Sequence, residues 1–501
     1  MSWAYLQRLR EYRDQESGLE VKTAPVRVAL CYPNVYSVAA SSLGFQVVYR
    51  LINAAPEMSA ARAMLPDEDL AEEVPPGGVL TLEEEKPLAS YPVVAFSISY
   101  EMDLVGIIDL LRKAGIPHMG AERTEDDPFV LVGGPMTLSN VLPLHPFADA
   151  VVMGDAEAVL PTVLEILRSA ESHPERRQRL AEVAGVYVPE HHGWDVPEPN
   201  VVGPEYLPAY GTFWTPRSEL SNMFLVESSR GCPQYCKFCV VRAANTPMRY
   251  PDAHEIQRTI PAEAPRVGFV GAAVSEYPHI KELLASCIDR DQEIGLSSLR
   301  ADVLDDEFVE LLVRGGARTM TIASDAPSEL QRSRLAKGLK ERHLLHAAEL
   351  ARKHGLHRLK VYAIIGLPEE TDADLDELAR FALEMSRIHK VTLAVNPLIP
   401  KLRTPLAGAP FCSISELNRK IKLLRKRAGR RVDFRFLSPR WAWVESMLSL
   451  GGPETGMAAV AVSDAGGGYH AWKAALKRVD QPFAARDYAE ETARSSWLPR
   501  R

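Results

Sequence analysis

Three cysteines, Cys232, Cys236 and Cys239, lie within eight residues of one another in this 501-residue chain, with the spacing Cys-x3-Cys-x2-Cys. The apolar run 223–228 has the pattern of a buried strand, and Gly231 ends that strand just before the first cysteine. We therefore expect the three thiols on one short loop, where they can converge on one metal centre. A cluster of four irons and four sulfides normally takes four thiolates, so three would leave one iron open to a substrate or cofactor.

Two other interpretations of these cysteines stay open at this point. Structural zinc sites use ligand spacings that overlap this one, but they need a fourth ligand, and the nearest histidine, His254, lies beyond two turn signals. Three unrelated buried cysteines would need no metal at all. The aromatic residue Phe238, directly before the third cysteine, favours the iron–sulfur cluster over both.

In this loop the chain resembles the radical S-adenosylmethionine (SAM) enzymes. The resemblance implies that Cys232, Cys236 and Cys239 hold a 4Fe-4S cluster, whose fourth iron is chelated by the amino and carboxylate groups of SAM. One electron then cleaves SAM to methionine and a 5'-deoxyadenosyl radical, which abstracts hydrogen from a substrate. The implied partner is an electron donor of the flavodoxin or ferredoxin type, and the substrate stays unknown.

Composition limits the class of protein. Hydrophobic residues make up 46% and charged residues 25% of the chain, as in ordinary soluble globular proteins, and the formal net charge of -8 argues against general nucleic-acid binding. The six cysteines form neither a disulfide framework nor a second cluster, so we expect a reducing cytoplasm and no auxiliary iron–sulfur centre. No apolar run approaches the roughly 20 residues of a membrane span, and the charged N-terminus is not a signal peptide.

Residues 221–437 alternate between strand and helix patterns, which predicts a partial (β/α)6 TIM barrel, the usual fold of the family that the chain resembles. In such barrels the chemistry lies at the carboxyl ends of the strands. The predicted strands end near Arg230, Gly271, Arg300, Ser324, Gly366 and Asn396. The predicted helices cover residues 253–262, 280–289, 305–314, 341–354, 373–388 and 414–427.

The resemblance places SAM-binding residues at the second and third of these strand ends. Small residues at Gly271 and Ala272 would let the backbone accept the SAM ammonium group. Arg300 would pair with the methionine carboxylate, because a guanidinium matches carboxylate geometry. The alternative for this arginine is an ion pair with Asp302, two residues further on.

The fourth and fifth strand ends carry the other implied SAM contacts. Asp325 stands where the family often has a ribose-binding glutamate. Ser328 either contacts the ribose as well or caps the helix that follows, which needs no cofactor. Ile365 and Gly366 belong to a segment similar to the family's fifth-strand motif, which packs against adenine.

Residues 1–168 predict a Rossmann-like domain, preceded by an N-terminal helix. Short apolar strands at 26–32, 93–99, 129–132 and 148–153 are separated by helical stretches, which indicates a parallel sheet with right-handed crossovers. Such sheets bind ligands at the carboxyl ends of their strands.

This domain is similar to the cobalamin-binding domain that precedes many radical SAM enzymes. The usual cobalt-ligating histidine after the first strand is missing, and Asn34 and Tyr36 occupy that neighbourhood. Either cobalamin binds without a histidine ligand or the domain is a degenerate Rossmann module. The positions that would line the slot for the nucleotide tail are Ser97, Ser99, Gly133 and Gly134.

The remaining segments have less specific patterns. Residues 169–220 predict a linker of mixed pattern, with a helical stretch at 174–184 and, from Pro189 onward, a part rich in proline and glycine that predicts an ordered strap. Residues 438–501 predict a small C-terminal cap over the open side of the barrel. The basic run 418–431 is interpreted first as a solvated helix face and second as a site for an anionic partner.

The leading hypothesis from the sequence is a cobalamin-dependent radical SAM methyltransferase that acts on an unactivated carbon. A second hypothesis keeps the radical chemistry but replaces methyl transfer by rearrangement, cyclisation or oxidation. A third is non-enzymatic, namely a zinc-containing protein that binds RNA through its basic helix. Metal analysis separates the third from the other two, because the third requires zinc without iron or sulfide.

Overall fold

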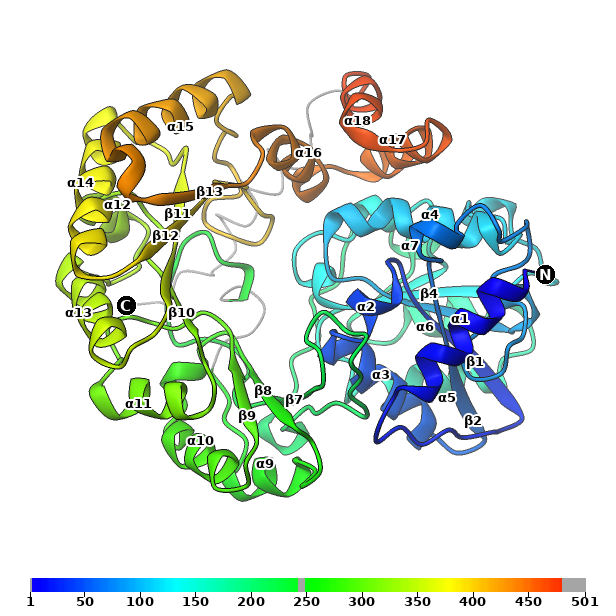
Figure 1. Ribbon diagram of the computed structural model, residues 1–501. Coiled ribbons are helices and arrows are strands. Elements are labelled where there is room, and N and C mark those ends of the chain that lie inside the picture. The colour runs from blue at the N-terminus through cyan, green and yellow to red at the C-terminus, as the bar shows by residue number, and fades with distance from the viewer. Residues whose placement is uncertain (1, 242–247, 480–501) are drawn as a thin grey trace. The chain divides into compact units, whose positions relative to one another are not determined.

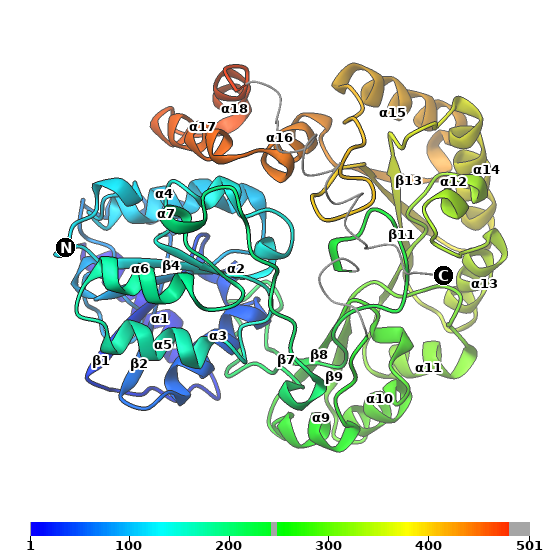
Figure 2. The ribbon, with the colours of Figure 1, turned by 180° about the vertical axis from the view of Figure 1, so that it is seen from behind.

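The computed structural model describes residues 2–241 and 248–479. These residues form two units, of which the first comprises residues 2–224 and 450–479 and the second comprises the described residues between 225 and 449. Figures 1 and 2 show the elements of both units from opposite sides.

The first unit is built on one six-stranded sheet with the strand order β2-β1-β3-β4-β5-β6. Neighbouring strands are parallel except for β5 and β6, which are antiparallel. The predicted Rossmann-like parallel sheet is therefore confirmed, with β2 and β6 as strands that the sequence analysis did not predict. The six strands are β1 (Val26–Tyr32), β2 (Met58–Met64), β3 (Val93–Ser97), β4 (Phe129–Gly133), β5 (Ala150–Val152) and β6 (Val186–Tyr187).

Helices cover both faces of this sheet (Figures 1 and 2). From β1 the chain runs through α3 (Leu43–Ala54) to β2 in one direction, whereas from β3 it runs through α4 (Leu104–Lys113) to β4 in the other. Because crossovers between parallel strands are right-handed, these opposite directions put α3 and α4 on opposite faces. The direction changes between β1 and β3, so the carboxyl ends of these two strands border the crevice where such sheets bind ligands.

Local signals explain where the helices of this unit begin. The Ser42 side chain accepts a hydrogen bond from Phe45 N at 3.3 Å and starts α3, whose apolar face buries Phe45, Tyr49 and Ile52. The unit's other helices up to residue 192 are α1 (Trp3–Asp14), α2 (Tyr36–Ala39), α5 (Leu160–Ser169), α6 (His173–Ala181) and α7 (Pro189–His192).

The segment 169–220, which we expected to be a linker, is part of the first unit. It contributes α6 and the edge strand β6, and its proline-rich portion runs along the end of β5. There, Asn200 N donates to Met153 O at 2.9 Å, and Asp155 N donates to Asn200 O at 3.0 Å. Backbone pairing of this kind satisfies the polar groups of the segment and holds it in order at the end of β5.

The expected C-terminal cap is divided between the two units, because residues 438–449 belong to the second unit and residues 450–479 belong to the first. Helices α17 (Pro453–Asp464) and α18 (Gly468–Leu476) follow α16 (Pro439–Leu450), and α17 packs on α4. In that contact, Arg112 donates to Ser463 Oγ at 2.7 Å, and Ser463 donates in turn to Asp109 at 2.5 Å. Residues 450–479 therefore pack with the first unit, and residues 480–501 lie outside the described part.

The second unit is a curved run of parallel strands, in agreement with the predicted partial barrel. A three-stranded sheet β7-β8-β9 and a four-stranded sheet β10-β11-β12-β13 are joined by a parallel bridge between Leu299 and Ile322. All six predicted strands are present, and β13 adds a short seventh. The strands are β7 (Met223–Glu227), β8 (Arg266–Val270), β9 (Glu293–Leu296), β10 (Thr319–Ala323), β11 (Arg358–Ile365), β12 (Val391–Pro397) and β13 (Asp433–Phe436).

The helices of this unit lie along the outside of the curve formed by the strands (Figure 1). Side-chain caps set the starts of several of them; for example, Asp305 accepts a hydrogen bond from Phe308 N at 2.9 Å at the start of α11. Of these helices, only the short α12 was not predicted. The helices are α9 (Ala253–Thr259), α10 (Ile280–Ile288), α11 (Asp306–Arg314), α12 (Glu329–Arg334), α13 (Glu341–Lys353), α14 (Asp372–Ile388) and α15 (Ile414–Ala428).

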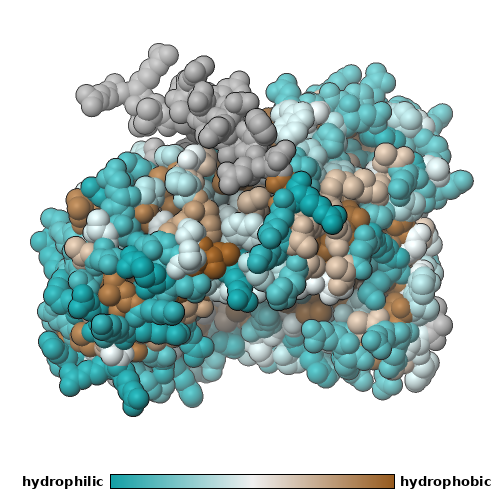
Figure 3. All heavy atoms as spheres, turned by 90° about the horizontal axis from the view of Figure 1, so that it is seen from above, coloured by the Kyte–Doolittle hydropathy of each residue, from teal (hydrophilic) through white to brown (hydrophobic). Residues whose placement is uncertain are grey.

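The surface is mostly hydrophilic on the face that Figure 3 shows, with apolar residues in small groups. Exposed large apolar side chains such as Trp3 and Trp194 are scattered along the chain, which is normal for a folded protein. Within residues 2–241 and 248–479, no helix combines the length and the apolar character needed to cross a lipid bilayer.

Candidate active site

The cysteine loop follows the carboxyl end of β7 and is held there by its neighbours. Ser228 N donates to Val270 O at 3.0 Å, which joins the end of β7 to the end of β8. Arg230 forms a bidentate ion pair with Glu227, with N–O distances of 2.8 and 2.7 Å. Bidentate pairs of this kind restrict both side chains, so the start of the loop is well positioned.

The three cysteines come together on this loop. Cys236 is buried, Cys232 and Cys239 are partly buried, and a turn in which Cys239 N donates to Cys236 O at 3.2 Å brings the last two together. Burial raises the pKa of the Cys236 thiol to about 11, and the other two thiols raise it as well, which places all three near one another. Such thiols ionise when a metal centre supplies positive charge, so the donor set fits a thiolate-ligated cluster.

Phe238 anchors the loop in an apolar cluster at the strand ends. The buried members of that cluster are Ala326, Leu335, Leu367 and Leu398, which follow β10, α12, β11 and β12. Phe238 and Ile364 pack against it together. The side chain next to the third cysteine therefore packs the loop against residues that follow three strands, β10, β11 and β12.

The segment between α12 and α13 supports the loop from another side. Lys237 N donates to Leu335 O at 3.0 Å. Two residues further along that segment, Lys337 forms an ion pair with Asp325, and both side chains are mostly buried. The Lys337 ammonium lowers the pKa of Cys236 and the Asp325 carboxylate raises it, so this ion pair lies beside the second cysteine.

Gly271 is required for the close approach of β8 to the cysteine loop. A Cβ atom at this position would lie 2.6 Å from Ser229 Oγ and 2.8 Å from Ser229 O. Any larger residue would push the two strand ends apart, so only glycine allows this contact. Its neighbour Ala272 is exposed in the turn that follows.

Glu276 is a residue of this site that the sequence analysis missed. Its Oε1 accepts a hydrogen bond from the Gln234 side chain at 2.8 Å, whereas its buried Oε2 has no hydrogen-bond partner among the described residues. The carboxylate also raises the pKa of Cys232, so it lies near the first cysteine. A buried, unsatisfied carboxylate oxygen beside the thiols is a ready acceptor for a ligand's cationic donor.

Arg300 makes the alternative contact that the sequence allowed. Its guanidinium donates to both carboxylate oxygens of Asp302, at 3.1 and 2.6 Å, and its Nε lies 3.6 Å from Glu276 Oε1. The structure therefore shows the ion pair with Asp302, and the contact of Arg300 with a methionine carboxylate stays a prediction.

Ser328 likewise has a structural role. It is fully buried, its Oγ accepts a hydrogen bond from Gln331 N at 3.1 Å as the N-cap of α12, and it donates to Asp374 at 2.5 Å. The hydroxyl thus already accepts one hydrogen bond and donates another, and the structure shows the helix cap, which is the alternative to the ribose contact. Asp325, three residues earlier, adopts a positive φ of 59°, which turns the chain away from β10.

The fifth-strand prediction is displaced by one residue. Ile365 is fully buried, whereas Ile364 lies on the opposite face of β11 and packs with Phe238 at the apolar cluster. Side chains alternate along a strand, so the residue on the cysteine side is Ile364. Gly366 follows with a φ of +77°, and a Cβ there would lie 2.9 Å from Cys412 Cβ.

At the ligand crevice of the first unit, the structure brings together residues from β1 and β3. Asn34 Nδ2 donates to Asp103 Oδ1 at 3.4 Å, and Tyr32 donates to Ser99 Oγ at 3.2 Å. Burial raises the pKa of Asp103 to about 6, against the effect of the Asn34 amide and neighbouring backbone N–H groups. Asn34 and Ser99 thus lie at the crevice, together with an acid that the sequence analysis did not single out.

The other predicted residues of this crevice line the ends of β3 and β4. Ser97 is buried and pairs in register with Gly133. Gly134 has a φ of +113°, and a Cβ there would lie 2.5 Å from Ile98 O. The backbones after β3 and β4 therefore touch, which requires glycine at the second position but not at Gly133.

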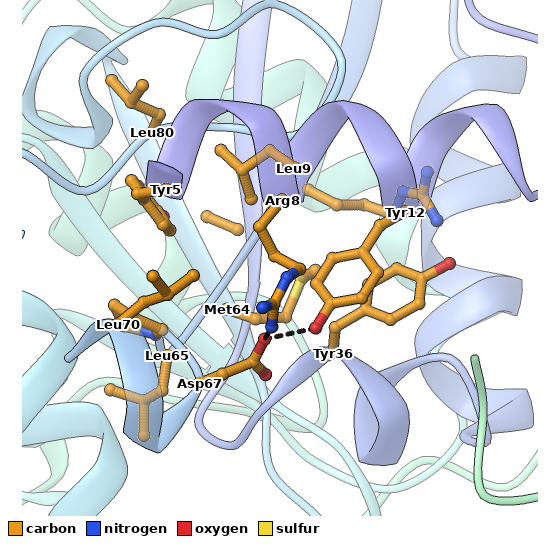
Figure 4. A pocket seen from close by; sticks show the side chains of 13 residues that line it. Tyr5, Arg8, Leu9, Tyr12, Tyr36, Met64, Leu65, Asp67, Leu70 and Leu80 are labelled. Atoms are coloured by element: carbon orange, nitrogen blue, oxygen red, sulfur yellow. Dashed lines mark hydrogen bonds and ion pairs between the residues drawn. The ribbon is translucent and has the colours of Figure 1, made fainter. Parts of the chain in front are cut away.

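Tyr36 is committed to packing in the first unit. Figure 4 shows its ring beside that of Tyr12 from α1, and the two rings stack with centroids 4.0 Å apart. The Tyr36 hydroxyl donates to Glu16 at 2.7 Å, and the residue is 2% exposed. Helix α1 covers this side chain, so its predicted role in cofactor binding is not compatible with the structure.

Among the residues that the structure describes, no three histidine, cysteine or acidic side chains are gathered closely enough to hold a single metal ion. His254, the nearest histidine in the sequence, lies in α9, where its backbone N–H donates to the capping Asp252 at 2.8 Å.

Two families match separate segments of the chain. The family described as "Radical SAM proteins, N-terminal" matches residues 44–189, and the family described as "Radical SAM superfamily" matches residues 226–382. The first segment lies within the first unit and runs from α3 to the start of α7. The second begins in β7, includes all three cysteines and ends in α14.

Individual proteins are similar over much of the chain. An uncharacterized protein of Methanocaldococcus jannaschii is 27% identical over 421 residues, which cover 81% of this chain and 85% of that protein. An uncharacterized methyltransferase of Pyrococcus horikoshii is 22% identical, and the match covers 57% of this chain and 65% of that protein. The solved structure of the cobalamin-dependent S-adenosylmethionine radical enzyme OxsB with aqua-cobalamin bound has a TM-score of 0.47 at 14% identity, covering 75% of this chain and 56% of that one.

The chain spans less than two thirds of the lengths of the Pyrococcus protein and of OxsB. The superfamily match, by contrast, includes the strands that carry the cysteine loop and every residue of that loop. Residues 226–382 of this chain therefore match the radical SAM superfamily.

Proposed function

We propose that this protein binds a 4Fe-4S cluster through Cys232, Cys236 and Cys239, and SAM at the open iron of that cluster. The observation that carries the proposal is the buried Oε2 of Glu276, which has no partner among the described residues and lies near Cys232. An unsatisfied carboxylate oxygen is costly in a protein interior. The ammonium group of SAM is a donor of the matching charge, and its binding would remove that cost.

The other side chains around the loop suit the rest of SAM. Phe238 and Ile364 offer an apolar wall for the adenine. Asp325 supplies a carboxylate on the same side as Cys236, suited to ribose hydroxyls. When bound, the cluster supplies the electron that cleaves SAM to methionine and a 5'-deoxyadenosyl radical, which takes hydrogen from the substrate.

We further propose that the first unit binds cobalamin and that the reaction is methyl transfer to an unactivated carbon. The support is the crevice between β1 and β3, the change-of-direction point where parallel sheets hold ligands, which Asn34, Ser99 and Asp103 border. The name of the Pyrococcus relative as a methyltransferase agrees with this reaction class. No histidine follows β1 in the sequence through Ser42, so that segment offers the cobalt no imidazole ligand.

The test uses the full-length protein, reconstituted anaerobically with iron and sulfide. We expect about four irons per chain and, with SAM and dithionite, release of 5'-deoxyadenosine. With added hydroxocobalamin and reductant, we expect a bound corrinoid and formation of S-adenosylhomocysteine. Protein that takes up zinc but neither iron nor sulfide would overturn the radical SAM function and favour the zinc alternative.

A second reaction class is rearrangement, cyclisation or oxidation by the same radical without methyl transfer. The missing histidine after β1 is the observation that favours it. This class is selected if the reconstituted protein releases 5'-deoxyadenosine but binds no hydroxocobalamin and forms no S-adenosylhomocysteine.

We also propose an electron donor of the flavodoxin or ferredoxin type. Helix α15 and the residues just after it present a surface of exposed cations, of which Arg419 and Arg427 are paired with Asp372 and Asp376. Acidic donors meet such a positive surface faster at low salt, because ions screen the attraction. Reduction of the cluster by flavodoxin should therefore slow as sodium chloride is raised, and a salt-independent rate would count against this docking mode. The other exposed cations on and just after α15 are Lys422, Arg425, Lys426, Arg430 and Arg431.

A further inference from the structure

A buried ion pair joins helix α15 to the turn after β11. Lys420 Nζ lies 2.7 Å from Glu370 Oε1, and the two side chains are 6% and 0% exposed. Lys420 also lies 3.8 Å from Glu416, one helical turn earlier. Lysine and glutamate are rarely buried unless they are paired, so the burial of both side chains requires that they stay in contact.

The same carboxylate holds the backbone of the turn. Glu370 Oε1 accepts a hydrogen bond from Gly366 N at 3.0 Å, and its Oε2 accepts one from Leu367 N at 3.3 Å. Glu370 N donates back to Leu367 O at 3.2 Å, which closes the turn. Gly366 has its left-handed φ of +77° within this network. Three donors therefore converge on one carboxylate group, and two of them are amides of the turn itself.

Helix α15 also confines this turn sterically. A Cβ at Gly366 would lie 3.0 Å from the side chain of Leu417, which is in α15, and 2.9 Å from Cys412 Cβ. The turn is thus clamped by packing from α15 and by the Lys420 charge from the same helix. Burial raises the pKa of Glu370, whereas the Lys420 ammonium and the Gly366 and Leu367 amides lower it.

Net stability is a poor explanation for this arrangement. Replacing a buried ion pair by apolar side chains of similar volume is often neutral or stabilising, because two charges lose their hydration. Arg419, the residue before Lys420 on α15, forms an exposed pair with Asp372, and an exposed pair avoids that cost. A buried pair that also binds two backbone amides defines a conformation, namely that of residues 366 and 367.

We propose that the ion pair of Lys420 and Glu370 positions the turn at Gly366 and Leu367 so that it can form the adenine wall of the SAM site. Leu367 belongs to the apolar cluster that anchors Phe238, so the turn and the cysteine loop share one packing unit. This inference rests on the proposed SAM binding and adds α15 to the elements that set its affinity. Lys420 and Glu370 are positioning residues, which act on SAM through the turn.

The test compares three variants of the full-length, reconstituted protein. Lys420→Met removes the buried cation. The double variant Lys420→Met with Glu370→Gln removes both charges, so no stranded carboxylate threatens folding. Arg419→Met is the matched control, because it breaks an exposed pair on the same helix. Hydrogen exchange of the Gly366 and Leu367 amides, the melting temperature and the SAM dissociation constant are measured for each.

In both Lys420 variants we expect the two amides to exchange faster and SAM to bind roughly 10-fold more weakly, because small displacements of a binding wall have large effects. SAM cleavage at saturating SAM should stay within about twofold of wild type, because the turn affects binding more than chemistry. The control variant should match wild type in all three measurements.

If the double variant folds, keeps both amides protected and binds SAM as wild type does, the positioning role is refuted while the proposed function stands. If wild type itself binds no SAM, the proposed function fails and the positioning role fails with it. Faster amide exchange without a change in SAM affinity also refutes the inference, because the turn would then be structural only.

Discussion

Single side chains around the cysteine loop differ in whether their polar atoms are already satisfied. The Arg300 guanidinium is taken by Asp302, and the Ser328 hydroxyl is taken by a helix cap and by Asp374. Glu276 keeps one buried oxygen without a partner among the described residues. Unsatisfied buried groups bind ligands most favourably, so we assign the ligand contact to Glu276 and not to the other two.

The first prediction concerns this carboxylate. Glu276→Gln should weaken SAM binding by roughly 10- to 100-fold, since a hydrogen bond to a charged group contributes about 1.5–3 kcal/mol. Iron content should stay at the wild-type level, because the residue is not a cluster ligand. Equilibrium binding of SAM and iron analysis check both points. Glu282→Gln, an exposed glutamate of α10, is the control and should bind SAM as wild type does.

The second prediction concerns Asp103. Its folded pKa of about 6 lies above the ordinary value of 3.8, mainly because of burial. The folded state therefore holds this proton more tightly than the unfolded chain, and the resulting stability is present at low pH and lost as pH rises through about 6. Asp103→Asn mimics the neutral form, so its stability advantage over wild type should grow from pH 5 to 7.5, by about 1 kcal/mol.

Urea unfolding of wild type and variant at pH 5, 6 and 7.5 measures that difference. Parallel stability profiles for the two proteins would show that the Asp103 carboxyl does not titrate in this range. Asp126→Asn, at an exposed position in the same unit, serves as the control and should leave the pH profile unchanged.

At the scale of elements, the ends of β7 and β8 must touch for the loop to be held. Gly271→Ala should destabilise the second unit by about 1–3 kcal/mol, because the added methyl group overlaps the Ser229 backbone. Iron uptake should fall as well, since the shifted strand end carries the cysteine loop. Urea unfolding and iron analysis test this prediction together.

Gly44→Ala is the matched control for that glycine. A Cβ at Gly44 in α3 meets no atom within 4 Å, and alanine favours a helix over glycine by up to about 1 kcal/mol. This variant should therefore be as stable as wild type or slightly more so, with unchanged iron content. Equal losses in both variants would mean that the close approach of Gly271 to Ser229 is unimportant.

At the scale of the whole molecule, the proposed chemistry is divided between two units with separate cores. The variant with Cys232, Cys236 and Cys239 all changed to alanine should lose iron and SAM cleavage. It should still bind hydroxocobalamin, because the proposed corrinoid crevice lies in the first unit. Iron analysis and corrinoid absorbance after gel filtration measure the two properties in one sample. Retained SAM cleavage would contradict the proposed function, and loss of both cofactors would contradict this division.

The sequence by itself determined the features that depend on near neighbours along the chain. The Cys-x3-Cys-x2-Cys spacing defines one loop, and the periodicities of 2 and 3.6 located all six barrel strands and most helices. The strand β2 was not predicted from the sequence, because its residues, Met58–Met64, include three alanines, and alanine has a low strand propensity. Its burial comes from pairing with β1.

Only the tertiary structure decided which side chains face the cysteines. Alternation along β11 puts Ile364 and Ile365 on opposite faces, but only packing shows that Ile364 and Phe238 lie against the same apolar cluster. The partners of Glu276 and Glu370 come from other elements, with Lys420 lying 50 residues beyond Glu370. Contacts between residues so far apart depend on how the elements pack, and local patterns carry no information about that.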